Sequence, residues 1–280
     1  GTLSVINGGS ATLTGAVTGT MSIAAGGGAT LGNGGSLSQA SLSNAGTFIV
    51  NKSVDSSLST AISGAGGFQK LGSGILTVTG NNTYTGATTV SAGGLKVNGV
   101  LGSGSLSVAA SAWLMGTGTI NGPVTVSGTL TPGGAGPGVI TLASLVLTPT
   151  SSTVIEIASA GTRGSAYDGV SILGAGGLTY GGTMSIVFGS SAIADNTTFN
   201  IFSTGSSTGS LAAIESSGYY AGTWTSLGSG TYQLLSGSQT LTFSQTTGDV
   251  IVVPEPTVIA LAAAGLGAMA YAVRRRYRQA

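Results

Sequence analysis

The chain of 280 residues contains 51 glycines, no cysteine and no histidine, and only 5% of its residues are charged. These counts exclude a disulfide framework and thiolate chemistry, and the 41% of hydrophobic residues argues against the disorder that so much glycine would otherwise indicate. Four of the eight basic residues lie in the last seven positions. The body before Pro254 therefore has four Lys or Arg against six Asp or Glu, and we expect no nucleic-acid partner.

Residues 1–130 consist of short alternating runs separated by glycine turns. In the runs 76–78, 95–97, 106–108 and 124–126, two aliphatic side chains flank a polar one, which is the period-two pattern of a half-buried strand. One such strand cannot bury its apolar face alone. Stacked coils can, because each rung hydrogen-bonds to neighbours about 4.8 Å away and the inward side chains form one core. We therefore predict an all-β solenoid, with a β-sandwich as the alternative.

Residues 131–252 differ from this first region. Two prolines among the glycines of 131–138 cannot occupy central strands, so they predict a loop or a change of register. Aromatic residues become frequent after the loop, and longer strands are expected at 140–147, 153–157, 183–188, 198–202 and 239–243. We predict a β-rich continuation or cap that covers the open edge of the solenoid.

Residues 253–280 form a tail with three parts in order. Val253, Pro254, Glu255 and Pro256 come first, followed by an apolar stretch over 257–273. The stretch is near the lower length limit for a single transmembrane helix, and a buried helix of a soluble domain is the alternative. Four arginines follow it: Arg274, Arg275, Arg276 and Arg278. Because positive charge stays cytoplasmic, the body would lie outside the cytoplasmic membrane.

This tail resembles the PEP-CTERM sorting signal of bacteria, because Pro254-Glu255-Pro256, the apolar segment and the arginine cluster occur in that order. The resemblance implies an exosortase as partner, which would cleave near the motif after transient residence in the inner membrane. The protein would then reach the cell surface or the extracellular matrix. Alternatively, the prolines form a stiff spacer before a permanent anchor.

Residues 64–90 resemble the autotransporter-associated β-strand repeat. The residues that carry this likeness are Gly72, Gly74, Asn82, Thr83, Tyr84, Thr85 and Gly86. The resemblance implies a right-handed parallel β-helix of the passenger type. Autotransporters continue into an outer-membrane barrel, whereas this chain continues into the sorting tail, so we carry over the fold and not the secretion mechanism.

The acidic residues are isolated in sequence, and the body has a single arginine. We therefore expect no catalytic residue, no metal, no cofactor and no enzymatic activity. The sequence favours an exported structural or adhesin-like protein, whose Ser, Thr and Asn side chains would bind polysaccharide through many weak hydrogen bonds. Two alternatives stay open: a carbohydrate-active enzyme whose acids converge on a groove, and a non-catalytic passenger part of a longer chain. The start at Gly1, without methionine or leader, favours a partial product.

Overall fold

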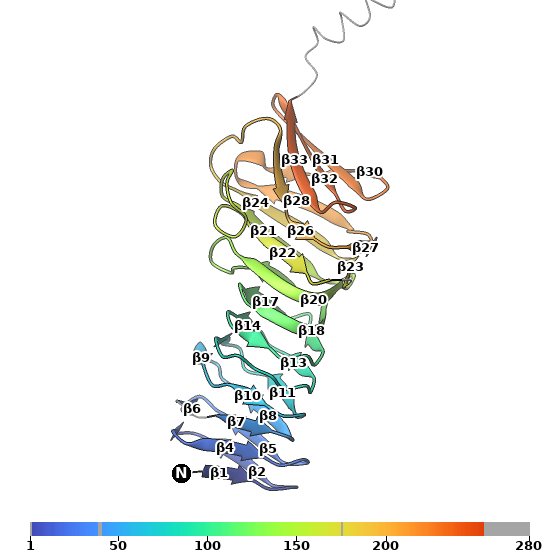
Figure 1. Ribbon diagram of the computed structural model, residues 1–280. Coiled ribbons are helices and arrows are strands. Elements are labelled where there is room, and N and C mark those ends of the chain that lie inside the picture. The colour runs from blue at the N-terminus through green and yellow to red at the C-terminus, as the bar shows by residue number, and fades with distance from the viewer. Residues whose placement is uncertain (1, 39–40, 175, 255–280) are drawn as a thin grey trace, which may run out of the picture.

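The computed structural model describes residues 2–38, 41–174 and 176–254. Parallel strands stack rung upon rung from β1 (Thr2–Val5) to a small antiparallel sheet at the opposite end (Figure 1). Residues that are neighbours in the stack lie one whole rung apart in the sequence: Phe68 pairs in parallel with Phe48 on one side and with Thr88 on the other. The predicted β-solenoid is thus confirmed, and the β-sandwich alternative is wrong.

Two long sheets run along the solenoid. The path of the 13-stranded sheet is β2 (Ser10–Leu13), β5 (Gly28–Leu31), β8 (Thr47–Val50), β11 (Gly67–Lys70), β13 (Thr88–Val90), β16 (Leu106–Val108), β18 (Thr119–Val126), β20 (Val139–Leu147), β22 (Gly169–Ile172) and β26 (Phe202–Ser203), with β15 (Val100–Leu101), β23 (Gly177–Tyr180) and β27 (Ser206–Gly209) beside it. The 9-stranded sheet contains β9 (Ser56–Leu58), β12 (Ile75–Val78), β14 (Gly93–Val97), β17 (Ala112–Gly116), β19 (Thr129–Pro132), β21 (Ser152–Ile157), β24 (Thr183–Phe188), β28 (Ala213–Ser217) and β29 (Gly222–Thr223).

Three smaller sheets complete the described structure. The first rungs add a 4-stranded sheet of β1, β4 (Thr20–Ile23), β7 (Leu42–Asn44) and β10 (Ile62–Ser63), and a 2-stranded sheet of β3 (Ala16–Val17) and β6 (Ser36–Leu37). The antiparallel 5-stranded sheet, called the cap below, contains β25 (Thr197–Asn200), β33 (Asp249–Pro254), β32 (Gln239–Ser244), β31 (Thr231–Ser236) and β30 (Thr225–Gly228). A 3₁₀ turn, η1, covers Gly218–Tyr220.

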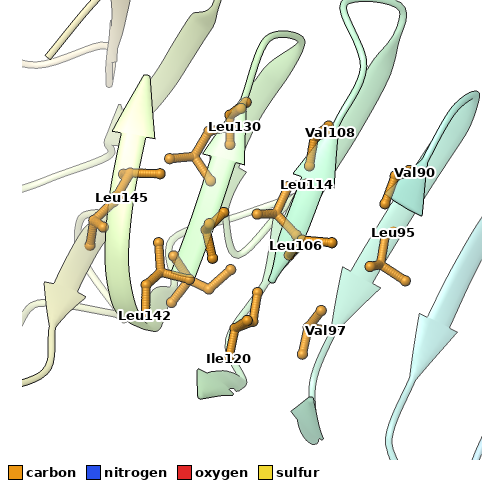
Figure 2. Packing of buried hydrophobic residues seen from close by; sticks show 14 of the residues in the cluster. Val90, Leu95, Val97, Leu106, Val108, Leu114, Ile120, Leu130, Leu142 and Leu145 are labelled. Atoms are coloured by element: carbon orange, nitrogen blue, oxygen red, sulfur yellow. The ribbon is translucent and has the colours of Figure 1, made fainter. Parts of the chain in front are cut away.

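The core consists of in-register columns of aliphatic side chains. Leu76, Leu95, Leu114 and Leu130 occupy equivalent positions on four successive rungs, and all four are fully buried. Figure 2 shows such leucine and valine side chains from neighbouring rungs following one another along the solenoid. Each buried leucine contributes about 1.5–3 kcal/mol by leaving water, so the repeated inward position holds the stack together.

A column of glycines lies at one corner of the solenoid. A Cβ atom added to Gly86 would meet the carbonyl oxygen of Gly66 on the preceding rung. The same close approach to the preceding rung recurs along the corner, at Gly46, Gly66, Gly104 and Gly122. Only glycine permits this backbone-to-backbone contact, so much of the glycine content serves close stacking of the coils.

The loop at 133–138 interrupts the sequence pattern but not the solenoid. Strands β20 and β21, which follow the loop, pair in parallel with β18 and β19, which precede it. The pairing of β18 with β20 shifts its register between Ile120 and Pro123, so the rungs on the two sides of the loop are not in uniform register. The parallel stack then continues to β28, so the antiparallel cap occupies only the C-terminal part of the predicted 131–252 region.

Most strands expected after the loop are present, with one correction. The predicted 183–188 strand is β24, and the predictions at 140–147, 153–157 and 239–243 fall within β20, β21 and β32. The single strand expected at 198–202 is wrong, because the chain divides there into β25 of the cap and β26 of the 13-stranded sheet. The amides of Ile201 and Phe202 both donate to the carbonyl of Gly248, which bends the chain between the two sheets.

Aromatic side chains join the cap to the last rungs, where the sequence concentrated them. Tyr180 of the solenoid packs edge-on against Phe202 and Phe243, with ring centroids 5.3 and 6.2 Å apart. The Tyr232 hydroxyl donates to the Leu211 carbonyl over 2.6 Å. In the part of the chain that the structure describes, no helix is both long and apolar enough to cross a membrane. The helix predicted over 257–273 lies outside that part.

Candidate functional surfaces

The predicted sorting motif begins inside the last strand of the cap. In β33, Val253 pairs with Thr240 and Pro254 pairs with Gln239, and Pro254 is exposed. A proline is tolerated at this strand end, because its missing N–H removes no bond from the middle of the sheet. Glu255, Pro256 and the arginines lie outside the described residues. The folded body thus extends up to the motif.

Two glycines of the repeat motif pack against the preceding rung. Gly72 lies against the backbone of Lys52, and Gly74 lies against the backbone of Val54 and Asp55. A Cβ atom at either position would overlap these backbone atoms. Both glycines therefore have a structural role in coil stacking.

Asn82 is buried and connects three rungs through its side chain. Its Oδ1 accepts a hydrogen bond from the Ile62 amide over 2.9 Å, and its Nδ2 donates to the carbonyls of Gly80 and Val100 over 3.1 and 2.8 Å. The next amide, that of Thr83, donates to the Ile62 carbonyl over 2.8 Å. The Asn82 side chain thus takes the place of a strand carbonyl where the chain turns.

Tyr84 points into the core, whereas Thr83 and Thr85 are exposed. The Tyr84 ring packs edge-on against Phe68, which stacks on Phe48 of the rung before, with centroids 6.2 and 5.8 Å apart. Its hydroxyl is 2.7 Å from the Thr88 hydroxyl, and burial raises its pKa to about 12. The motif residues between 82 and 86 therefore supply packing and hydrogen bonds within the solenoid.

Lys70, which sequence reasoning did not single out, is buried within the same repeat. Its ammonium group donates to the carbonyl of Gly72 and, over 3.1 Å, to that of Ala92 on the next rung. Burial lowers the pKa of Lys70, and the charge of Asp55 opposes this shift. The side chain thus caps backbone carbonyls at the turn where the motif glycines lie.

The acidic side chains are used mainly as hydrogen-bond acceptors. Asp168 is fully buried and accepts the amides of Gly138 and Glu156, each over 2.8 Å, while burial raises its pKa to about 7. Asp55 accepts the Ile75 amide, and Asp249 accepts the Asn200 side chain, both over 2.8 Å. Within residues 2–254, apart from the undescribed positions 39–40 and 175, no three Asp, Glu, His or Cys side chains form a cluster that would hold a metal ion.

An uncharged column, called the polar column below, follows the outer face of the 13-stranded sheet. Its members occupy the same outward position on successive rungs: Thr12, Thr30, Ile49, Gln69, Thr89, Ser107, Thr125, Val146, Thr179 and Thr208. The rungs repeat at about 4.8 Å, and the hydroxyls of Thr179 and Thr208 are 3.2 Å apart. Seven of its ten members carry a hydroxyl group without charge, and Ile49, Gln69 and Val146 interrupt the series.

The outer face of the 9-stranded sheet carries a groove of about 390 Å³. It is lined by Asp55, Ile75, Thr77, Lys96, Met115, Thr131, Gly134 and Ala135. Trp113 stands on the same face, and 48% of its surface is exposed. Sequence reasoning missed this groove, although the alternation of Ala112, Trp113 and Leu114 already places the tryptophan on the outward side of a strand.

Comparison with known proteins confirms both resemblances. Residues 68–97 match the Passenger-associated-transport-repeat, and residues 252–276 match the PEP-CTERM protein-sorting motif. Over 117 residues, the chain is 38% identical to the adhesin BmaC autotransporter of Brucella suis biovar 1 (strain 1330). The match covers 37% of this chain and only 3% of the adhesin. Together these similarities indicate an exported cell-surface protein built on a β-solenoid.

Proposed function

We propose that this chain is a non-catalytic, adhesin-like element of the bacterial surface, which an exosortase processes at the C-terminal motif. The observation that carries the proposal is the position of the sorting motif, which begins in the final strand of a capped, repeat-built solenoid. A folded body whose last described strand carries the first residues of a sorting signal is the arrangement expected of exported cargo.

The outward surfaces suit adhesion better than catalysis. The polar column offers many weak hydrogen-bonding groups, each worth about 1 kcal/mol net, along a rigid support. Glycoside cleavage needs paired carboxylates on either side of a bond, but Asp55, Asp168 and Asp249 each bind separate parts of the backbone or an asparagine. These placements support a structural role for the three acids.

Processing is tested by fractionating cells and determining the C-terminus by mass spectrometry. We expect a terminus near Glu255 in protein found beyond the inner membrane. Replacing Pro254, Glu255 and Pro256 together by alanine should retain the full tail, whereas Glu215→Ala, an exposed change on β28, should leave processing intact. A wild-type chain that keeps its tail through Ala280 and stays in the inner membrane would contradict the proposal.

Adhesion is tested with the same cells. Surface-displayed protein should retain cells on immobilised matrix polysaccharide, and a strain that lacks the chain should be retained less. Equal retention of the two strains would remove the adhesive part of the proposal and leave the sorting part standing.

A further inference from the structure

We propose that the end of the cap around Pro254 rests on a zwitterionic lipid surface while residues 257–273 cross the membrane. The inference deepens the proposed function and rests on its sorting step, because it takes this apolar stretch to be in the membrane before the exosortase acts. It assigns a contact surface and an orientation to the folded body. The surface, called the cap pole below, consists of Leu235, Val253, Pro254 and the exposed turn at 237–238.

The cap pole belongs to the end of the molecule that lies farthest from β1. Strand β33 ends there, as Figure 1 shows. Val253 and Leu235 are both ladder partners of Thr240, so their side chains lie on the same outer face of the cap. Leu235 is 64% exposed. The exposure of one leucine indicates no partner by itself, and the partner follows instead from the short tether between the cap and the apolar stretch.

The tether is formed by Glu255 and Pro256. The three residue steps from Pro254 to Thr257 reach at most about 11 Å when the chain is fully extended. The headgroup layer on each side of a bilayer is about 5–8 Å thick, because a bilayer of about 40–45 Å encloses a hydrocarbon core of about 30 Å. Pro254 must therefore lie inside the headgroup layer or within about 6 Å of its outer surface.

The length of the apolar stretch leaves no slack in this tether. As a helix, the 17 residues of 257–273 would span about 26 Å, which is less than the hydrocarbon core of about 30 Å. A stretch that is too short draws its flanks toward the core, and the arginines that begin at Arg274 keep the other flank at the cytoplasmic headgroups. The mismatch therefore holds the cap pole against the outer headgroups.

The chemistry of the cap favours zwitterionic over anionic lipid. Between Arg163 and Arg274 the sequence contains no lysine or arginine, so the cap has no basic group to attract anionic headgroups. Asp195 adds a negative charge beside the pole, because it accepts a hydrogen bond over 2.6 Å from Gln239, the ladder partner of Pro254. Contact with lipid thus depends on the tether and on apolar side chains.

Hydrogen bonds join the cap pole to the solenoid and so fix its orientation. The Gln239 side chain accepts from the Tyr220 hydroxyl over 2.7 Å and donates to the Ile193 carbonyl over 2.9 Å. With the cap pole on the lipid, β1 lies farthest from the membrane. The ten strands from β2 to β26 are separated by nine steps of about 4.8 Å, so the polar column extends over about 43 Å away from the lipid surface.

The test uses single-cysteine variants of the full 280-residue chain, which has no cysteine of its own, in phosphatidylcholine nanodiscs that hold one copy each. Each cysteine carries a nitrobenzoxadiazole dye. Leu235→Cys and Ser238→Cys place the dye on the cap pole, and Ala264→Cys reports insertion of the apolar stretch. Leu227→Cys is the matched control, because Leu227 is 57% exposed on β30 of the same sheet but lies beside the first residue of β31, whereas Leu235 lies near its end.

We expect headgroup-spin-labelled lipid to quench both cap-pole dyes and to leave the Leu227→Cys dye unchanged. Iodide in the aqueous phase should quench in the opposite order. Replacing part of the phosphatidylcholine by anionic lipid should not increase the lipid quenching, because the cap has no basic group. Leu235→Cys and Ser238→Cys report the contact independently, so it remains measurable if one of them fails to fold.

The inference is overturned if lipid quenches the Ala264→Cys dye while the cap-pole dyes stay as open to water as the Leu227→Cys dye. The proposed sorting would then stand, with the body held away from the membrane. An Ala264→Cys dye that lipid does not quench would reject the membrane step of sorting together with the inference. Cap-pole dyes shielded from iodide without lipid quenching would show that protein covers the pole, and quenching that requires anionic lipid would indicate a different surface; both results reject the contact.

Discussion

Replacing Asn82 by alanine or by aspartate isolates the energetic contribution of the repeat motif. The side chain makes three hydrogen bonds to three rungs, and at about 1 kcal/mol net for each, Asn82→Ala should cost about 3 kcal/mol of unfolding free energy. The Ile62 amide loses its side-chain acceptor. The Val100 carbonyl keeps the Asn82 backbone amide, and the Gly80 carbonyl keeps the Val100 amide.

Asn82→Asp preserves size but changes which groups can be satisfied. One carboxyl oxygen can still accept from Ile62, whereas the other replaces a donor that faces the carbonyls of Gly80 and Val100. The ionised form is disfavoured there, so the pKa of the new carboxyl should lie above its usual value of about 3.9. The folded state then binds the proton more tightly. The free energy of unfolding of this variant is therefore highest below about pH 4. It falls as the pH rises, by up to about 1.4 kcal/mol per pH unit.

The assay is chemical denaturation followed by circular dichroism, with hydrogen exchange read on peptides that cover residues 58–66. Because each rung contacts only its neighbours, exchange should increase around Ile62 before it increases in the cap. Asn81→Ala is the matched control, since Asn81 is exposed and has the same side chain. The reasoning is refuted if Asn82→Ala and Asn81→Ala differ by less than about 0.5 kcal/mol, or if the aspartate variant shows the pH dependence of the wild type.

Three further changes test the packing and the buried charge. Gly86→Ala should cost about 1–3 kcal/mol or more, because its Cβ meets a backbone carbonyl, whereas Gly15→Ala, with open space around it, should be near neutral in thermal unfolding. Phe68→Ala removes the ring between two others and should cost about 3–5 kcal/mol by the same measurement. The pKa of Asp168 is raised from 3.8 to about 7, so stability should be complete below about pH 4 and fall as the pH rises through 7. Asp168→Asn should flatten this dependence, measured as the denaturation midpoint against pH.

The solenoid and many of its strands were predictable because they depend on local pattern. The alternation at 76–78 and 95–97 assigns an inward and an outward face to each residue without knowledge of any partner strand. The match of 183–188 to β24 has the same origin. In contrast, the division of 198–202 at Ile201 depends on Gly248, which lies far along the chain, and no local pattern reports that contact.

The candidate surfaces were less predictable, since they depend on register. Asn82 could be assigned to a turn from sequence, but its bonds to Ile62 and Val100 require knowing which rungs are adjacent. The groove likewise needs the alignment of Lys96, Met115 and Thr131 on neighbouring strands and the return of the 133–138 loop over the sheet. Turn lengths set these alignments, and they vary between rungs.

The architecture separates the residues that hold the fold from those available to a ligand. Inward columns such as the one through Leu95, the corner glycines and Asn82 bind each rung to the next, and none of them needs an outward side chain. Outward positions can therefore change with little cost to stability. Among the described residues, the last ladder pair of β33 joins Pro254 to Gln239. Cleavage after Pro254 would leave every one of these described cap pairs in the folded body.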